Sequence, residues 1–272
     1  MDKLTTYRSF SSICQGASHE KSGVVCQDAV ASFTNKKIAI CVVSDGHGSE
    51  KHFRSDVGSK KAVSIAKKAI KEFCTRKLAI KRLLQGEETV LKELSAYIVT
   101  RWVDAVEKHL EENPCSSDEL LLFNKYYAKT DNYTKIYGAT LIAGVVTQEC
   151  AFIIKNGDGA AFVIEKNGDA HIPKSTINEE LFAGMVTSIS DSNCLDGFRY
   201  YITDSCPQAI IVASDGVTDS YAGNDFVVFC SKLISLYKED HEQAQYFLDD
   251  WLPKLSHKGA RDDMSVAGVY LQ

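Results

Sequence analysis

A run of six small or β-branched residues, Ile38–Val43, leads directly into the polar sequence Ser44-Asp45-Gly46-His47-Gly48. An apolar run of this length, bounded by turn-forming residues, predicts a buried strand, so the polar cluster lies where the strand ends. There a carboxylate can bind a hard cation, a glycine lets its carbonyl approach that cation, and an imidazole can exchange a proton near neutral pH. An Asp-Gly turn between strands explains the same residues equally well, so the cluster alone does not decide the function.

The composition is that of an ordinary globular protein. The chain has 272 residues, 44% of them hydrophobic, and its net charge of -5 gives no electrostatic reason to expect nucleic acid or an anionic membrane as a partner. No apolar stretch approaches the roughly 20 residues that span a bilayer, and the polar N-terminus lacks a signal-peptide core, so we expect a cytoplasmic protein. The nine cysteines include no Cys-x-x-Cys pair, which favours reduced thiols without a zinc site.

Helical periodicity is clear in two segments of the first half. Ser55 and Asp56 can cap a helix whose apolar positions recur every three or four residues as far as Phe73. A second stripe of the same period runs from Leu91 to Leu110 and is typical of a core helix. Two further helices are expected over 225–238 and 241–256.

Strands are predicted over 8–16, 29–34, 38–43, 139–146, 151–155, 160–165, 210–213 and 266–271. Tight turns at 156–159 and 167–168 indicate that the middle strands are antiparallel neighbours. Residues 173–208 are polar and poorly periodic, which predicts an irregular flap over a more regular body. No linker or internal repeat divides the chain, so we expect residues 1–272 to form a single domain.

Aspartate occupies five of the expected strand ends. Each is typical of a turn when taken alone, because Asp favours turns through local hydrogen bonds. Strands of a common sheet place their ends along one edge, where several carboxylates can surround the same cleft, and gathered like charges require a cation. Ligation by carboxylates, a glycine carbonyl and water suits Mg²⁺ or Mn²⁺ rather than zinc. The residues are Asp28, Asp45, Asp158, Asp215 and Asp262.

Five motifs follow one another along the chain: Ser44-Asp45-Gly46-His47-Gly48, Tyr137-Gly138-Ala139-Thr140-Leu141, Asn156-Gly157-Asp158-Gly159, Ala213-Ser214-Asp215-Gly216-Val217 and Arg261-Asp262-Asp263-Met264-Ser265-Val266. In order and spacing they resemble the motifs of the metal-dependent protein serine/threonine phosphatases, the type 2C family, in its bacterial-like single-domain form. The resemblance runs from about residue 9 to the C-terminus. It implies an α+β fold, a four-layer α/β/β/α sandwich of two antiparallel sheets flanked by helices, which agrees with the elements predicted above.

The resemblance also implies a site that binds two Mg²⁺ or Mn²⁺ ions and a weaker third ion. Its metal-binding residues are implied to be Asp28, Asp45, Gly46, Asp158, Asp215 and Asp262. Asp45 is implied to bridge two ions, Asp158 to help hold the third, and Asp28 to support the metal-bound waters. His47 falls where the family has its candidate general acid. Asp45 and His47 are therefore the predicted catalytic residues.

The implied reaction is hydrolysis of phosphoserine and phosphothreonine in proteins by attack of a metal-bridging hydroxide. Two cations roughly 3.5 to 4 Å apart can neutralise the phosphate, lower the pKa of the bridging water and align the attack. Protonation by His47 helps the serine or threonine alkoxide to leave. The expected partner is a phosphorylated protein substrate, with the enzyme opposing a Ser/Thr kinase, and the enzyme is expected to be a monomer.

Two positions depart from the family pattern. Gly23 stands where the family carries an Arg that contacts substrate phosphate, and Gln27 replaces an acid next to Asp28. Arg54 is the predicted replacement for the phosphate-binding Arg, because a guanidinium can hold two phosphate oxygens at once. A solvated Arg54 is the competing interpretation, and His19 with Lys21 is a second candidate for the phosphate-binding role.

Two other functions stay open at the level of sequence. The departures at Gly23 and Gln27 suit a catalytically weak module that binds phosphoproteins. The same scaffold also suits a hydrolase of a small phosphorylated metabolite. The complete set of metal-binding acids favours the protein phosphatase.

Overall fold

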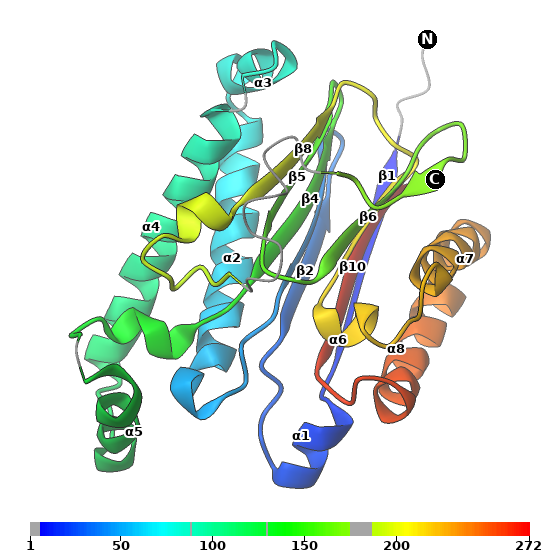
Figure 1. The fold of residues 1–272 in the computed structure, drawn as a ribbon. Coiled ribbons are helices and arrows are strands. Elements are labelled where there is room, and N and C mark those ends of the chain that lie inside the picture. The colour runs from blue at the N-terminus through cyan, green and yellow to red at the C-terminus, as the bar shows by residue number, and fades with distance from the viewer. Residues whose placement is uncertain (1–5, 88, 129, 175–186) are drawn as a thin grey trace.

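Two antiparallel β-sheets lie face to face, with helices covering both outer faces, in the computed structural model, which describes residues 6–87, 89–128, 130–174 and 187–272 (Figure 1). The first sheet has the order β1-β10-β9-β6-β7 and the second the order β2-β3-β4-β5-β8. The arrangement confirms the predicted α/β/β/α sandwich.

Within the described residues, each sheet contains five strands. The first is formed by β1 (Tyr7–Cys14), β10 (Met264–Leu271), β9 (Ala209–Ala213), β6 (Ala160–Ile164) and β7 (Ala170–His171). The second is formed by β2 (Ala29–Thr34), β3 (Ile38–Ser44), β4 (Leu141–Thr147), β5 (Ala151–Asn156) and β8 (Arg199–Thr203). Neighbouring strands in the described sheets are antiparallel. The prediction that the middle strands are neighbours is confirmed for β4 and β5 but is wrong for β5 and β6, because the turn at 156–159 crosses from the second sheet to the first.

Helices α2 (Ser55–Cys74), α3 (Lys77–Leu84), α4 (Thr89–Glu112) and α5 (Ser117–Tyr127) lie on the side of the second sheet, and α7 (Asp225–Glu239) and α8 (His241–Lys258) on the side of the first (Figure 1). The short helices α1 (Ala17–Ser22) and α6 (Asp215–Thr218) lie at one end of the sandwich. Three 3-10 turns complete the described elements: η1 (Glu50–His52), η2 (Tyr133–Tyr137) and η4 (Cys194–Gly197). None of the helices in the described part of the chain has the length and apolarity needed to cross a membrane.

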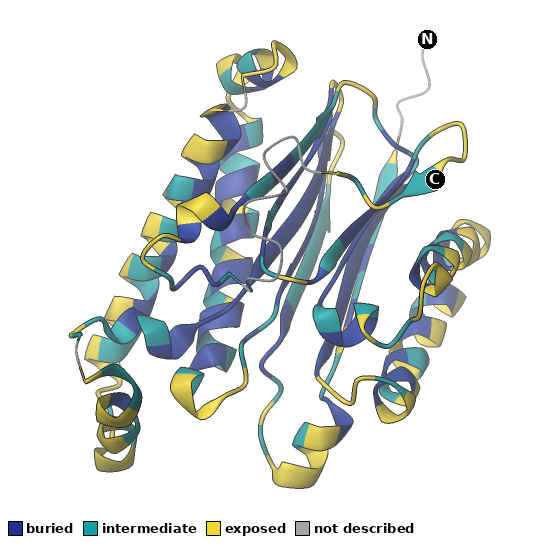
Figure 2. Cartoon of the chain, viewed as in Figure 1, coloured by how far each residue is buried: buried dark blue, intermediate teal, exposed yellow. Residues whose placement is uncertain are grey.

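Strand β3 shows why the run before the polar cluster is apolar without interruption. Every residue of β3 is buried. Ala39, Cys41 and Val43 face the other sheet, whereas Ile40 and Val42 pack in the core beneath the helices. A strand covered on both faces cannot alternate polar and apolar residues. Burial is concentrated between the layers, and the outer helix faces are exposed (Figure 2).

Helices α2 and α4 are pressed closely against the segment that leads into β4. The Trp102 indole of α4 is fully buried and donates to the Gly58 carbonyl at 2.9 Å. A Cβ atom at Gly58 would lie 1.9 Å from the Tyr137 carbonyl oxygen. This close approach holds the Tyr137–Leu141 motif against the helices, directly beside the end of β3.

The predicted flap over 173–208 is wrong at its C-terminal end. Residues 199–203 form β8, which pairs with β5 in register from Ala151↔Thr203 to Lys155↔Arg199. Strand β8 is an edge strand in which only Tyr200 is fully buried, so the apolar alternation that marks most strands is absent. Residues 175–186 of the predicted flap lie outside the described residues.

Candidate metal centre

Three of the predicted aspartates meet at one end of the sandwich. Asp45 follows β3, Asp158 lies in the turn between β5 and β6, and Asp215 follows β9 as the first residue of α6. One carboxylate oxygen of each lies within 4.8 Å of the others. The group draws on both sheets, which corrects the expectation that the strands share one sheet edge: the acids gather where the ends of two packed sheets converge.

The backbone at Asp45 is fixed by the Tyr137–Leu141 motif. The Asp45 amide donates to Thr140 Oγ1 at 2.9 Å, and the Thr140 amide donates to the Asp45 carbonyl at 2.8 Å. Gly46 forms an isolated bridge with Ala139, and a Cβ atom at Gly46 would lie 2.7 Å from two backbone carbonyl oxygens, those of Gln27 and Ser55. Only glycine fits this position, so the chain passes close to the centre with its carbonyl available as a ligand.

The segment containing Asp262 is held against Asp215. The Ser214 amide donates to the Ser265 carbonyl, and the Ser265 amide donates to Ser214 Oγ, both at 3.0 Å. A Cβ atom at Gly216 would lie 2.1 Å from the Asp263 carbonyl oxygen, which leaves no room for a side chain there. These contacts bring Asp262 close enough for its charge to act on both Asp45 and Asp215.

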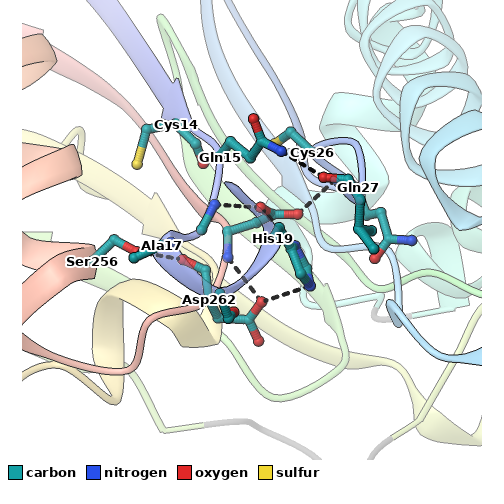
Figure 3. Close-up of polar contacts among 12 residues, drawn as sticks. Cys14, Gln15, Ala17, His19, Cys26, Gln27, Ser256 and Asp262 are labelled. Carbon is teal, nitrogen blue, oxygen red and sulfur yellow. Dashed lines mark hydrogen bonds and ion pairs between the residues drawn. The ribbon is translucent and has the colours of Figure 1, made fainter. Parts of the chain in front are cut away.

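Asp263 is a structural acid that the sequence motif did not distinguish from its neighbour. It is 4% exposed, and its two carboxylate oxygens accept from the amides of Gly16 and Gln27, each at 2.6 Å (Figure 3). These hydrogen bonds hold the segments before and after α1 against the residue that precedes β10. Asp262, the predicted ligand, is the more exposed of the two acids.

Burial and like charge raise the pKa values of the central acids. Burial raises the pKa of Asp28 to about 7, with added repulsion from Asp263 and Asp215. The pKa of Asp45 is raised well above its usual value by burial and then by the charges of Asp28 and Asp215. Burial also raises the pKa of Asp215. Carboxylates held together in this way are unfavourable without a compensating cation.

Two buried oxygens at this end of the sandwich show that the residues fit a divalent metal centre. Within the described residues, Asp28 Oδ2 and Gln27 Oε1 accept no hydrogen bond, although Asp28 is 2% and Gln27 7% exposed. Buried polar atoms are normally paired, so both oxygens indicate a missing partner. An ion with its coordinated waters would satisfy them, and the oxygen donors suit Mg²⁺ or Mn²⁺.

The sequence profile of the family described as Protein phosphatase 2C matches residues 15–253. The chain belongs to the protein phosphatase 2C family. Membership confirms the resemblance that the five motifs carry, and it identifies the chain as a metal-dependent protein phosphatase. The sequence matches no curated protein.

Solved structures share the fold of this phosphatase over nearly its full length. The serine/threonine phosphatase Stp1 from Staphylococcus aureus has a TM-score of 0.59 and 15% identity, covering 100% of this chain and 98% of that one. The S. agalactiae serine/threonine phosphatase has a TM-score of 0.57 and 17% identity, covering 98% and 100%. RsbX in complex with magnesium has a TM-score of 0.51 and 10% identity, covering 100% and 98%.

In this phosphatase, His47 lies beside a second histidine, His52. The ring centroids of His47 and His52 are 4.9 Å apart. Burial and, to a smaller extent, the His52 charge lower the pKa of His47 to about 4, and the charges of Asp158 and Asp191 oppose the shift. His52 Nδ1 donates to the Lys135 carbonyl at 2.6 Å. His47 is therefore a neutral imidazole at pH 7 before metal and substrate bind.

The predicted phosphate-binding role of Arg54 disagrees with the structure. Arg54 is 8% exposed, and all five N–H groups of its guanidinium donate hydrogen bonds. They donate to the Glu119 carboxylate, the Tyr137 hydroxyl, and the carbonyls of Asn113 and Pro114. The partners come from α5 and from segments distant in sequence, so the motif spacing on which the prediction depended could not reveal them. Arg54 stabilises the phosphatase fold and is not free to bind phosphate.

The glycine at the position of the usual phosphate-binding Arg also has a structural explanation. Gly23 ends α1 in the left-handed conformation, with φ 74°, and its amide donates to the His19 carbonyl. A residue with a side chain is strained in this conformation, and glycine is the common helix terminator there. In this phosphatase the position is therefore used to end a short helix.

Proposed function

We propose that this phosphatase hydrolyses phosphoserine and phosphothreonine in proteins with two divalent ions, Mg²⁺ or Mn²⁺, at the acidic end of its sandwich. The observation that carries the proposal is the convergence of Asp45, Asp158 and Asp215 within 4.8 Å. The unpaired oxygens of Asp28 and Gln27 beside this group support it. The magnesium in the RsbX structure, which has the same fold, makes Mg²⁺ a reasonable candidate.

Each acid has a separate part in holding the ions. Asp45 and the Gly46 carbonyl would hold one ion, and Asp215 and Asp262 would share the other with Asp45. Asp158, the most exposed of the clustered acids, would help hold a third. Asp28 Oδ2 would accept a hydrogen bond from water in the site, because no group among the described residues donates to it. Removing one acid should therefore weaken metal binding without removing the whole centre.

The bound ions supply charge that neutralises the phosphate and lowers the pKa of water between them. His47 supplies the proton that the departing serine or threonine oxygen requires. A dianionic phosphate next to the imidazole favours its protonated form, which offsets the effect of burial on the pKa of His47. Because Arg54 is engaged in the fold and Gly23 has no side chain, the ions bear most of the phosphate recognition.

The proposal also includes the domain organisation, oligomeric state, location and substrate of the enzyme. We expect residues 1–272 to act as a single domain and a monomer in the cytoplasm. Its substrate is a phosphorylated protein, and the reaction opposes a Ser/Thr kinase.

The test is phosphate release from phosphoserine and phosphothreonine peptides by the purified full chain with Mn²⁺ or Mg²⁺. Metal-dependent release that Asp45→Asn abolishes supports the proposal. Tight phosphopeptide binding without turnover supports the binding module instead. Preferential turnover of small metabolites in a substrate panel supports the metabolite hydrolase. Equal, low release by the wild type and Asp45→Asn contradicts the proposal.

A further inference from the structure

We infer that His19 is a nitrogen ligand of a divalent ion that it shares with Asp262. The site then binds a first-row transition-metal dication, such as Mn²⁺, in preference to Mg²⁺. The inference rests on the metal centre of the proposed function and adds to it a residue that the family motifs do not include. His19, Asp262 and Asp263 each offer one ligand atom, and these atoms lie within 4.8 Å of one another.

Helix α1 is fastened to the segment that contains Asp262, so the position of His19 is well determined. The Ala17 amide donates to Ser256 Oγ at 3.0 Å, and the Ser18 amide donates to the Arg261 carbonyl at 2.9 Å. A Cβ atom at Gly16 would lie 2.4 Å from the Asp262 carbonyl carbon, so the two backbones are in contact. Figure 3 shows the His19 ring directed toward Asp262.

The two ring nitrogens of His19 face different carboxylates. Nδ1 lies 3.0 Å from Asp263 Oδ1, and Nε2 lies 3.9 Å from Asp262 Oδ1. Nδ1 is buried and has no aligned hydrogen bond in the described part of the chain. The side chain is 17% exposed, so solvent reaches only part of the ring.

These distances assign the tautomer of a neutral His19. A nitrogen lone pair 3.0 Å from a carboxylate oxygen is repelled by its charge even where the two atoms are not aligned, so a neutral His19 carries its proton on Nδ1 and its acceptor lone pair on Nε2. A histidine that binds a metal through one nitrogen commonly presents its other N–H to a carboxylate. Asp263 is in place for this supporting role, because the Gly16 and Gln27 amides fix both of its oxygens.

The distance between His19 Nε2 and Asp262 Oδ1 suits two ligands of one ion. At 3.9 Å the two atoms are too far apart for a hydrogen bond. Two ligands that each lie about 2.0–2.2 Å from one ion are separated by about 3–4 Å. A Cβ atom at Gly216 would lie 3.4 Å from the Asp262 Cβ atom, so an ion between His19 and Asp262 would lie at the same end of the sandwich as Asp215 and the acid cluster.

A nitrogen ligand changes which metal the centre prefers. Imidazole binds first-row transition dications well, whereas Mg²⁺ prefers oxygen ligands. Gln27 removes one negative charge at this end of the sandwich, and His19 supplies a neutral donor on the same side. The competing interpretation is a protonated His19 that pairs with Asp262 and Asp263 only to hold α1. That interpretation predicts no metal–nitrogen bond.

The experiment is pulsed electron paramagnetic resonance of the full chain loaded with Mn²⁺, which detects a directly bound histidine nitrogen. We expect ¹⁴N modulation in the wild type, replaced by a ¹⁵N pattern after labelling with [¹⁵N]histidine. His19→Gln should abolish it and weaken Mn²⁺ binding by roughly ten-fold or more, with Mg²⁺ binding little changed. His47→Gln should keep the signal. His257→Gln is the matched control, because it removes the contact of His257 Nε2 with Glu20 of α1, 3.4 Å apart, without touching the cluster.

Absence of histidine coupling in the Mn²⁺-loaded wild type overturns the inference, as does coupling that a folded His19→Gln retains. If His19→Gln does not fold, crystals of the wild type soaked in Mn²⁺ decide the matter: an ion bonded to Nε2 supports the inference, and ions bonded only to oxygens overturn it. Such an all-oxygen centre with intact Mn²⁺-dependent phosphate release leaves the proposed function standing. A chain that binds Mg²⁺ but no Mn²⁺ contradicts the inference alone, and a chain that binds neither ion contradicts both.

Discussion

The guanidinium of Arg54 and the carboxylate of Glu119 form a two-point ion pair, Nε to Oε1 at 2.8 Å and Nη2 to Oε2 at 2.9 Å. The same carboxylate accepts from the Ser116 amide at 2.9 Å, as part of the capping box that begins α5. Arg54 also donates to the Tyr137 hydroxyl at 3.1 Å. One side chain therefore connects the start of α2, the start of α5 and the motif that holds Asp45.

Replacing Arg54 should change stability rather than phosphate recognition. Arg54→Ala leaves the Glu119 carboxylate and the Tyr137 hydroxyl without their partner, and we expect it to lower the free energy of unfolding by about 2 kcal/mol. Urea denaturation measures the loss, and phosphopeptide KM should stay near the wild-type value. Arg82→Ala, at a more exposed pair with Glu87, is the control and should lower stability much less than Arg54→Ala. Unchanged stability together with a large rise in KM would restore Arg54 as the phosphate ligand.

The Arg54–Glu119 pair also predicts a pH dependence. Hydrogen bonding from Arg54 lowers the pKa of Glu119 from 4.5 to about 2. Because the folded-state pKa lies below the unfolded one, the pair contributes its full stability above pH 4.5 and loses it as the pH falls toward 2. The difference in unfolding free energy between the wild type and Glu119→Gln should therefore shrink between pH 5 and about 3. A difference that stays constant over this range would show that Glu119 is not ionised in the pair.

Repulsion among the clustered carboxylates should lower the free energy of unfolding of the metal-free protein. Asp45→Asn removes one of several buried, mutually repelling carboxylates, so we expect it to raise the unfolding free energy of the metal-free protein by roughly 1 kcal/mol. It should also reduce the rise in melting temperature that Mn²⁺ gives the wild type, because metal binding is weakened. Thermal unfolding with and without Mn²⁺ measures both effects. Asp104→Asn, on the exposed face of α4, should change neither.

The sequence predicted those parts of the site that are local. Strand β3 is buried on both faces, so its continuous apolar run and the polar residues at its end are visible in the chain itself. The glycines beside the acids are also local signals, since Gly46 and Gly216 stand where backbone atoms leave no room for a Cβ atom. The individual strands, helices and strand-end acids followed from such runs and turns, whereas the four-layer sandwich and the roles of the ligands followed from the resemblance to the family.

The missed features depend on contacts between distant segments. Arg54 and Glu119 are 65 residues apart, and no spacing rule connects them. Asp263 sits next to the predicted ligand, but only the fold shows that its oxygens bind the amides of Gly16 and Gln27. His19 reaches the cluster because α1 is fastened to the segment before β10. Strand β8 lies at a sheet edge and has one buried residue, so its sequence lacks the alternation of polar and apolar residues that would predict a strand.

The proposed role of His47 predicts that the effect of its removal on kcat depends on whether the leaving group needs a proton. If His47 protonates the departing serine or threonine oxygen, His47→Gln should slow kcat for phosphopeptides by about 10²- to 10⁴-fold. The same variant should hardly slow p-nitrophenyl phosphate, because nitrophenolate leaves without a proton. Steady-state kinetics with both substrates at saturating Mn²⁺ measure the contrast.

A matched control separates proton donation from a general disturbance of the site. His241→Gln lies on α8, where the ring contacts Tyr270 on the far side of the first sheet, and it should leave both substrates unaffected. Equal slowing of both substrates by His47→Gln would mean that His47 holds the site together and gives no proton. A loss confined to the phosphopeptide assigns the proton to His47, since the fold and the metal centre are common to both reactions.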